Sequence, residues 1–437
     1  MSGPLPALFT TAGEESFARR SIRDRHATTL LEVIRENRVQ EPYRSRLLEF
    51  RAESLGGKLA DPLAGNRAAW DPALFERREL ADWRRAIRPQ LGRSWYELPW
   101  YFAEAFWFLK LLFAFGYYEP QGPNRLRDPF EPFKRRELLQ VGGLEAACGL
   151  GPLLAVPEGE PERTTAVAEL LLASLWGNRI DLSMHGLARE YRGQFLQHDE
   201  RQLLVDHSRE TARRLLASRR VDLLLDNAGP ELVCDLMLAA RLLSERPAAG
   251  GARQVVLHAK RSPFFVSDAR PADIRATIQA LSEAAAVPLR AAGDLLGRLL
   301  AEGRLRIRDH WFWNGPRFFH DMPPDLRAEL RAAELVLIKG DANYRRLVGD
   351  RHWPASTALE SLTGYFPAPF AALRTMKSEI VVDLNEVQLE HLQREDPEWR
   401  TNGRRGLVRL IARDAGGSRP AQQPAGGPAP PVIASRA

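Results

Sequence analysis

The second half of the chain contains short apolar runs of strand length that alternate with segments of helical periodicity. The runs are rich in Val, Ile and Leu, are bounded by polar turns, and lie at residues 221–225, 254–257, 334–338 and 380–384. Between them, residues 231–243 and 272–285 show helical spacing of apolar residues. Because such strands, alternating with helices, form sheets covered on both faces, the pattern predicts an α/β fold, an α/β/α sandwich around a mostly parallel sheet.

The first part of the chain has a helical pattern instead. Residues 16–38 and 42–55 show helical spacing of apolar residues, and prolines then divide the sequence into short helices and loops. A Gly/Pro/Glu-rich stretch at 156–163 is the most plausible boundary. We therefore predict three regions: an N-terminal helical domain at 1–160, an α/β/α domain at 161–414, and a disordered Gly/Pro/Ala-rich tail at 415–437.

Composition restricts the compartment and the partners. Two cysteines, Cys148 and Cys234, lie in apolar helical stretches without a CxxC partner, so we expect reduced core thiols and a cytoplasmic location. The most apolar run, 98–115, contains Glu104 and Lys110, which favours a buried helix over a membrane span. The net charge of +6 comes from Arg residues interleaved with acids, so we expect no nucleic-acid partner.

Polar residues follow the first predicted strand, at the sheet edge where open α/β folds bind ligands. Asp226 and Asn227 come directly after the run at 221–225, and Gly229 and Pro230 lead into the next predicted helix. Proline suits the first helical turn, glycine permits a tight approach, and a helix N-terminus favours anions such as phosphate. The alternative is an Asx turn with a helix cap, which Asp and Asn also provide.

Three further segments place polar groups near predicted strand ends. Asp268 follows an apolar stretch after the second run, and it either supplies an oxygen ligand or caps the helix that begins near residue 272. Residues 339–346 (Lys-Gly-Asp-Ala-Asn-Tyr-Arg-Arg) concentrate side chains that bind phosphate and metal around one glycine. Residues 374–377 (Arg-Thr-Met-Lys) place two cations beside a hydroxyl, which suits a phosphate or a solvated helix end.

Other polar residues lie in apolar surroundings. Asn178 and Asp181 follow an apolar helix, and they either line a site or form a helix-ending turn. A buried carboxylate must find partners or change its pKa, so Glu104 is either a site residue or half of a structural ion pair with an arginine. Residues 311–319 are expected to form a hairpin or an ordered loop, with the turn at Asn314-Gly315.

Together, these residue types indicate metal-assisted phosphoryl transfer to water. Asp and Asn oxygens suit Mg²⁺ or Mn²⁺, and Co²⁺ or Ni²⁺ can also be accommodated, while Lys and Arg suit a phosphate. The sequence has no GxxxxGK[ST] loop, which disfavours a P-loop nucleotide enzyme. It also has no GxSxG, no HExxH and no GxGxxG after a strand. Asp222 and Asp226 do not have the DxD spacing of haloacid-dehalogenase phosphatases.

One known family carries these motifs in this order. At residues 226–229, 339–345 and 374–377 the sequence resembles the damage-control phosphatases, and the matching motifs run from about residue 95 to 382. Residues 176–183 resemble the branch that contains the acidic-residue methyltransferase proteins of animals and sugar-phosphate phosphatases of yeast and plants. The resemblance implies a helical N-terminal domain on an α/β/α sandwich. It also implies one divalent ion, commonly Mn²⁺, Co²⁺ or Ni²⁺, held by Asp226, Asn227 and Asp268.

The resemblance further implies roles in the pocket. Residues 374–377 match the family's RTxK motif, with the lysine near the phosphate, and 340–345 match its Gly-Asp-x-Asn-Tyr-Arg motif. The substrate-binding residues implied by the resemblance are Glu104, Asp341, Asn343, Arg374 and Lys377. We add Asn178 and Asp181 as residues at the rim of the pocket. Asp226 and Asp341 are the predicted catalytic residues. Asp341 orients or deprotonates the attacking water, unless a carboxylate attacks and forms a phospho-enzyme.

The predicted function is therefore metal-dependent hydrolysis of small phosphorylated metabolites. The resemblance implies sugar phosphates, such as fructose 1-phosphate or fructose 6-phosphate. Two alternatives stay open. The first is an S-adenosylmethionine-dependent protein-carboxyl methyltransferase, although the sequence lacks a Gly-rich loop followed by an acidic ribose-binding residue. The second is a non-catalytic sugar-phosphate sensor. The oligomeric state and the physiological metal are not defined by the sequence.

Overall fold

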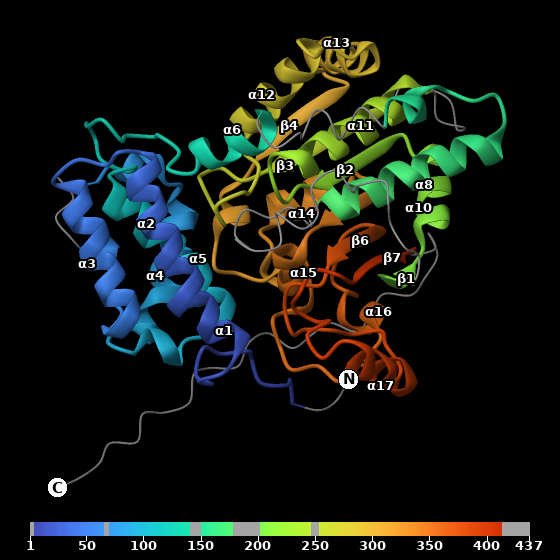
Figure 1. The fold of residues 1–437 in the computed structure, drawn as a ribbon. Helices are drawn as coiled ribbons and strands as arrows, with labels where there is room; N and C mark the ends of the chain where they lie inside the picture. Colours follow the sequence, from blue (N-terminus) through green and yellow to red (C-terminus); the bar gives the residue numbers. More distant parts are fainter. Residues whose placement is uncertain (1–3, 65–69, 140–149, 178–201, 246–252, 413–437) are drawn as a thin grey trace, which may run out of the picture.

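A sheet of seven strands lies at the centre of the structure (Figure 1). The computed structural model describes residues 4–64, 70–139, 150–177, 202–245 and 253–412. Its strands are β1 (Leu203–Asp206), β2 (Arg220–Leu224), β3 (Gln254–Ala259), β4 (Leu305–Asp309), β5 (Leu335–Lys339), β6 (Phe370–Thr375) and β7 (Gly406–Ile411).

The strand order is β1-β7-β6-β5-β2-β3-β4. Strands β6, β5, β2, β3 and β4 are mutually parallel, while β7 pairs with β6 in the antiparallel direction. From β2 the chain proceeds outward to β3 and β4, and from β5 it proceeds in the opposite direction to β6 and β7. The neighbours β2 and β5 therefore mark the topological switch point, where α/β sheets bind ligands outside the carboxyl ends of the strands. The predicted α/β fold with a mostly parallel sheet is confirmed.

The first three predicted strands are confirmed as β2, β3 and β5. The fourth prediction, a strand at 380–384, is wrong, because these residues form a loop and the strand is β6, ten residues earlier. Ile380, Val381 and Val382 are all buried, so their apolar character reflects core packing. Their segment is also bound by a side chain, since Arg374 Nη1 donates to the Ile380 carbonyl at 2.6 Å.

Besides β6, three further strands were not predicted. Strands β1 and β4 lie at the two edges of the sheet, and their mostly half-buried or exposed side chains give no continuous apolar run. The third, β7, is the antiparallel strand between β1 and β6. Residues 311–319 form an ordered loop with short 3₁₀ turns at Trp311–Asn314 and Phe319–Asp321, so the loop alternative holds and the hairpin does not.

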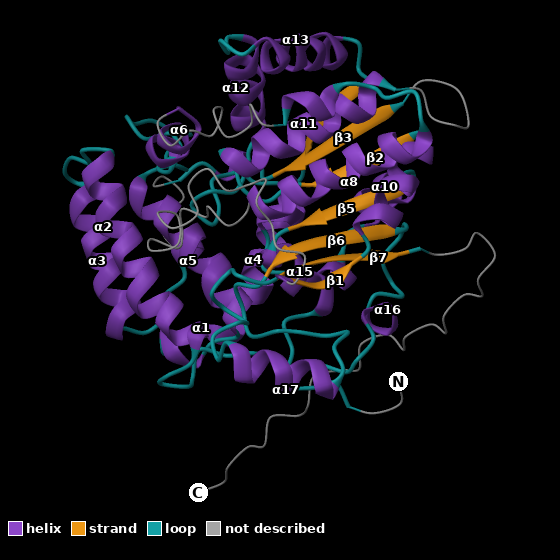
Figure 2. Ribbon diagram, turned by 45° about the vertical axis from the view of Figure 1, so that its right-hand side comes forward, coloured by secondary structure: helices purple, strands orange, loops and turns teal. Residues whose placement is uncertain are grey.

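Helices cover both faces of the sheet (Figure 2). Two separate apolar cores join them to it, one on each face. The helices of the first core are α8 (Glu160–Gly177), α10 (Ser208–Ala217), α11 (Pro230–Ser244), α12 (Pro271–Ser282) and α13 (Val287–Ala301). Those of the second are α14 (Pro324–Arg331), α15 (Asp341–Val348), α16 (Leu359–Leu362) and α17 (Glu386–Glu395).

A helical region from the first part of the chain lies beside this sandwich (Figure 1). It has its own apolar core, to which Phe264 and Val266 of the sandwich also contribute. Its helices are α1 (Phe17–Arg20), a π-helical segment (Ser21–His26), α2 (Ala27–Glu36), α3 (Tyr43–Gly56), α4 (Arg77–Ile87), α5 (Trp100–Phe115) and α6 (Glu131–Leu139). The predicted boundaries of the three regions stay predictions. No helix in the described ranges is long and apolar enough to cross a membrane.

Candidate active site

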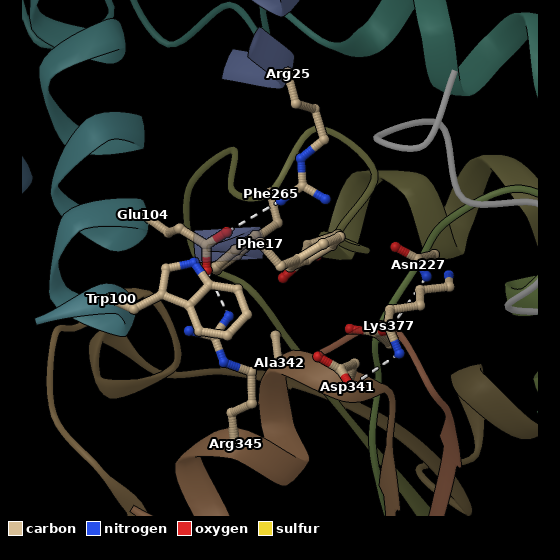
Figure 3. Close-up of a pocket in the computed structure, with 12 residues that line it drawn as sticks. Phe17, Arg25, Trp100, Glu104, Asn227, Phe265, Asp341, Ala342, Arg345 and Lys377 are labelled. Carbon is tan, nitrogen blue, oxygen red and sulfur yellow. Dashed lines mark hydrogen bonds and ion pairs between the residues drawn. The ribbon is translucent and has the colours of Figure 1, made fainter. Parts of the chain in front are cut away.

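A pocket of about 480 Å³, part of it open to solvent, lies at the carboxyl ends of the parallel strands and faces the helical region (Figure 3). It surrounds the switch point between β2 and β5, as expected for this fold. Helices α1 and α5 and the π-helical segment form its other wall. The lining residues are Phe17, Arg25, Trp100, Glu104, Asp226, Asn227, Phe265, Asp268, Asp341, Ala342, Arg345 and Lys377.

Two loops bring the three predicted metal ligands together. One follows β2 and carries Asp226 and Asn227, and the other follows β3 and carries Asp268. The loops pair through an isolated antiparallel bridge between Asn227 and Asp268, in which the Ala269 amide donates to the Asp226 carbonyl at 2.7 Å. All three predicted ligands are less than 7% exposed and line the pocket. The sequence did not predict this pairing, which places residues about 40 positions apart side by side.

The loop after β3 carries backbone strain at the pocket wall. Phe265 and Val266 have φ of 45° and 64°, in the left-handed region that β-branched and bulky residues rarely adopt. Such strain costs on the order of 1–3 kcal/mol and concentrates at functional sites. Here it turns the chain so that Phe265 lines the pocket, Val266 packs into the core of the helical region, and Asp268 faces Asn227.

The glycine of the segment 339–346 makes room for Asp226. Gly340 has φ +86° and ψ 165°, a conformation almost exclusive to glycine. A Cβ at this position would lie 1.9 Å from Asp226 Oδ2. The Asp226 carboxylate therefore occupies the space that any other side chain at 340 would take, and it contacts the backbone that leads into α15.

Asp341, the first residue of α15, is oriented by its neighbours. Its Oδ1 accepts hydrogen bonds from Arg374 Nε at 2.7 Å, from Ser378 Oγ at 3.0 Å and from the Lys377 backbone amide at 3.3 Å. These three bonds all go to one oxygen, and the carboxylate lines the pocket. Arg374 is fully buried behind Asp341 and does not line the pocket, so its predicted contact with substrate stays a prediction. Lys377, from the same motif, does reach the pocket.

Asn343 lies beside the pocket and is not among its lining residues. It is 1% exposed, and its Nδ2 donates to the carbonyls of Leu225 at 3.2 Å and Lys339 at 2.8 Å. The amide thus ties together the ends of β2 and β5, on which Asp226 and Asp341 depend. The structure gives Asn343 this positioning contact, and its direct contact with substrate stays a prediction.

Glu104 is both a pocket residue and an ion-pair partner. It is 1% exposed on α5, and its two oxygens accept from Arg25 Nη2 at 3.0 Å and from Arg345 Nη1. Arg345 also binds Asp350, with Nε to Oδ1 at 2.8 Å, and its guanidinium lies 3.5 Å from the centre of the Trp100 ring. The two readings of Glu104 in the sequence are therefore compatible: arginines hold the carboxylate in place at the pocket wall.

The sequence missed several lining residues. Phe17 and Arg25 belong to the distant N-terminal region, and no motif marks them. Arg25 reaches the pocket from a π-helical segment, a feature frequent at functional sites, which periodicity does not reveal. Trp100 and Phe265 are visible in the sequence only as aromatic residues in apolar stretches, which does not distinguish a pocket residue from a core residue. The predicted rim residues Asn178 and Asp181 lie outside the described residues.

The donor set fits a divalent metal ion. In the part of the chain that the structure describes, no three His, Cys, Asp or Glu side chains form a metal cluster, so a metal here depends on the amide oxygen of Asn227 together with two carboxylates. Asp226, Asn227 and Asp268 offer oxygen donors, which hard cations prefer. Lys260 Nζ lies 3.1 Å from Asp268 Oδ2 and balances part of the negative charge.

Comparison with known proteins shows the family of this chain. Residues 21–392 match the family model described as the damage-control phosphatase ARMT1-like domain. Relatives named damage-control phosphatase ARMT1 include the Danio rerio protein, 31% identical over 93% of this chain and 97% of its own length. The Mus musculus protein is 29% identical over 93% of this chain and 98% of its own length. The chain therefore belongs to the ARMT1-like damage-control phosphatase family.

Among solved structures, a DUF89 family protein from Pyrococcus horikoshii is similar to this chain. The two share 14% sequence identity with a TM-score of 0.43, and the match covers 88% of this chain and 95% of the other.

Proposed function

We propose that this chain is a metal-dependent phosphoric monoester hydrolase that acts on small phosphorylated metabolites. Its family is one of phosphatases, and the metal and the substrate are the proposed part. The observation that carries the proposal is the meeting, in one pocket, of Asp226, Asn227 and Asp268 with the carboxylate of Asp341 and the cation of Lys377. Oxygen donors for a metal and a cation for phosphate are the parts that phosphoryl transfer to water requires.

In the proposed mechanism, Asp226, Asn227 and Asp268 hold one divalent ion, Mn²⁺, Co²⁺ or Ni²⁺, with Mg²⁺ as a further candidate. When bound, such an ion polarises a phosphoryl oxygen and offsets developing negative charge. Lys377 binds the phosphate and stabilises charge on its oxygens. Asp341 is fixed through Oδ1, so that its carboxylate can orient the attacking water and accept a proton from it.

The wall opposite the metal ligands is suited to the rest of the substrate. The carboxylate of Glu104 lies between Arg25 and Arg345, and Asp350 also binds Arg345, so the charges of these four groups balance. A balanced set of donors and acceptors recognises hydroxyl groups without demanding a second anion. We therefore propose sugar monophosphates, with fructose 1-phosphate and fructose 6-phosphate as the first candidates.

Location in the cytoplasm is also proposed. Cys234 is a buried free thiol in α11, and burial raises its pKa to about 12. A reduced, unreactive core cysteine suits a reducing compartment. Cys148 lies outside the described residues.

The first experiment measures phosphate release from a panel of phosphorylated metabolites after chelation, with Mn²⁺, Co²⁺, Ni²⁺ or Mg²⁺ added back. Asp226→Asn removes a charge from the site, and Asp222→Asn is its matched control. Asp222 is a buried aspartate on β2 that pairs with Arg220 at 2.8 Å and with His258 at 2.9 Å, away from the pocket. We expect metal-dependent release that Asp226→Asn abolishes and Asp222→Asn retains.

Other outcomes would favour the alternatives. Tight binding of a sugar phosphate without release under any metal would indicate a sensor. Binding of S-adenosylmethionine in a calorimetric titration, again without phosphate release, would indicate a methyltransferase. Equal activity of Asp226→Asn and the native chain would refute the proposed metal site.

A further inference from the structure

A buried chain of polar side chains runs behind the pocket and ends at Asn227. Its centre is Lys339, the last residue of β5. Lys339 Nζ donates to Glu231 Oε1 at 2.7 Å, to Asp235 Oδ1 at 2.8 Å and to the Ser174 carbonyl at 3.1 Å. The Lys339, Glu231 and Asp235 side chains are each 1% exposed. The Lys339 side chain therefore points away from the pocket, although the sequence of its segment predicts phosphate and metal binding.

Glu231 connects Lys339 with Asn227. Its Oε1 accepts from Lys339, and its Oε2 accepts from Asn227 Nδ2 at 2.8 Å. On the other side of the amide, Ser267 Oγ donates to Asn227 Oδ1 at 2.6 Å. A flipped amide would set its oxygen against the Glu231 carboxylate, which is repulsive, whereas the Ser267 hydroxyl can reverse its hydrogen bond. Asn227 Nδ2 also donates to Asp226 Oδ2 at 3.1 Å, which favours the same orientation of the amide. This orientation therefore depends on Glu231, which accepts the shorter of the two Nδ2 hydrogen bonds, more than on Ser267.

Only a carboxylate satisfies both neighbours of residue 231. Lys339 and Asn227 each present a donor, and the two oxygens of Glu231 accept one each. A glutamine has one oxygen and one NH₂ group, so one contact would become donor against donor. Burial alone would lower the pKa of Lys339, but Asp235 and Glu231 hold it above its ordinary value, so the ammonium keeps its charge and its demand for acceptors.

We propose that Glu231, anchored by Lys339, is a positioning residue that fixes the amide of Asn227 so that its oxygen serves a divalent ion in the pocket. Glu231 is not among the lining residues and acts through Asn227. The inference rests on the metal site of the proposed function and extends it by a buried residue pair. Partners that orient metal ligands typically contribute about 10- to 100-fold in metal affinity.

The test is calorimetric titration of Mn²⁺ into the full chain after chelation, together with urea unfolding without metal. We expect Glu231→Gln to bind Mn²⁺ about 10- to 100-fold more weakly than the native chain. Glu245→Gln is the matched control, because Glu245 is also buried and paired, with Arg241, but lies roughly 20 Å along α11. Glu245→Gln is expected to lose stability and keep its Mn²⁺ affinity.

A rescue separates positioning from general damage. In Glu231→Gln combined with Lys339→Met, the competing donor is gone, so the glutamine oxygen can turn to Asn227. We expect Mn²⁺ affinity to recover about tenfold over Glu231→Gln alone, without recovery of stability. Native Mn²⁺ affinity in Glu231→Gln would overturn the proposal. So would a double variant in which Mn²⁺ affinity and stability both recover, or in which neither recovers.

If Glu231→Gln does not fold, Ser267→Ala decides. We expect it to weaken Mn²⁺ binding by about threefold, because Glu231 still fixes the amide. A loss of tenfold or more would assign the amide to Ser267 and overturn the proposal. A native chain that binds no divalent ion at all would instead refute the metal site of the proposed function.

Discussion

Replacement of Gly340 by alanine tests the geometry of the site most directly. The glycine lies between β5 and α15, and the Asp226 carboxylate fills the space where a side chain would be. A Cβ added at this position would collide with the Asp226 carboxylate. This carboxylate is buried, so it cannot move aside as a flexible surface side chain could. Gly340→Ala thus changes one methyl group and acts on a predicted metal ligand across the switch point of the sheet.

The magnitude follows from the distances. The Cβ would lie 1.9 Å from Asp226 Oδ2, whereas ordinary contact begins at 3.4 Å, so the two groups must separate by about 1.5 Å. A misplacement of about 1 Å in a catalytic group can cost about 100-fold in rate. The backbone conformation, φ +86° and ψ 165°, adds strain of about 1–3 kcal/mol for alanine. We therefore expect kcat/KM to fall at least about 100-fold, and Mn²⁺ affinity to fall with it.

Gly349→Ala is the matched control, because Gly349 ends the same helix. It also has positive φ, +82°, but its Cβ would meet nothing closer than His320 Cε1 at 3.8 Å. Gly349→Ala should lose on the order of 1–2 kcal/mol of unfolding free energy, measured in urea, and Gly340→Ala should lose at least as much. Only Gly340→Ala should lose phosphate release and Mn²⁺ binding. Native activity and affinity in Gly340→Ala, or equal losses in both variants, would refute the placement of Asp226 against Gly340.

Three further changes test other parts of the pocket and the helical region. Arg25→Ala removes a hydrogen bond to Glu104 on the wall opposite the proposed metal ligands, so KM should rise about tenfold with kcat nearly unchanged. A lower kcat at constant KM would contradict this role. Lys377→Met removes the cation that we propose binds the phosphate, and it should lower kcat by about 100- to 1000-fold in steady-state assays. Undiminished turnover would exclude that contact. Burial raises the pKa of Glu79 to about 7, so the folded chain binds a proton that the unfolded chain has released, and stability falls as pH rises from about 4.5 to 7. Glu79→Gln should therefore raise the unfolding free energy at pH 8 by about 1–3 kcal/mol and change little at pH 4, as urea unfolding at both values would show; an equal effect at both would count against this.

Where the sequence signal was local, it identified the segments that carry the candidate site. The run at 221–225 with Asp226, Gly229 and Pro230 predicted a strand, a polar turn and a helix start, and all three are present as β2, its loop and α11. Each depends on neighbours in the chain: a buried strand needs apolar residues, a positive φ favours glycine, and a helix tolerates proline in its first turn. The segment 339–346 was identified in the same way, because it follows a buried apolar strand and contains a glycine at the turn.

The strand prediction failed where apolar residues are buried in the core but do not pair with a neighbouring strand. Residues 380–384 have the composition of a buried strand, yet they form a loop whose backbone is bound by Arg374. Arg374, whose sequence pattern indicates a phosphate-binding cation, is buried behind Asp341, and its contact with substrate stays a prediction. Composition indicates that such groups need partners, but it does not indicate which partners the fold supplies.

The sequence by itself determined the class of fold, the strand-end segments that line the pocket, and the residue types of the candidate site, because these follow from local periodicity, turn preferences and side-chain chemistry. Only the tertiary structure decided which of these residues meet. The bridge between Asn227 and Asp268, the contact of Asp226 with Gly340, and the approach of Arg25 to Glu104 join residues that are far apart in the chain. Their proximity is set by strand order and by the packing of the helical region on the sandwich, which no single segment encodes.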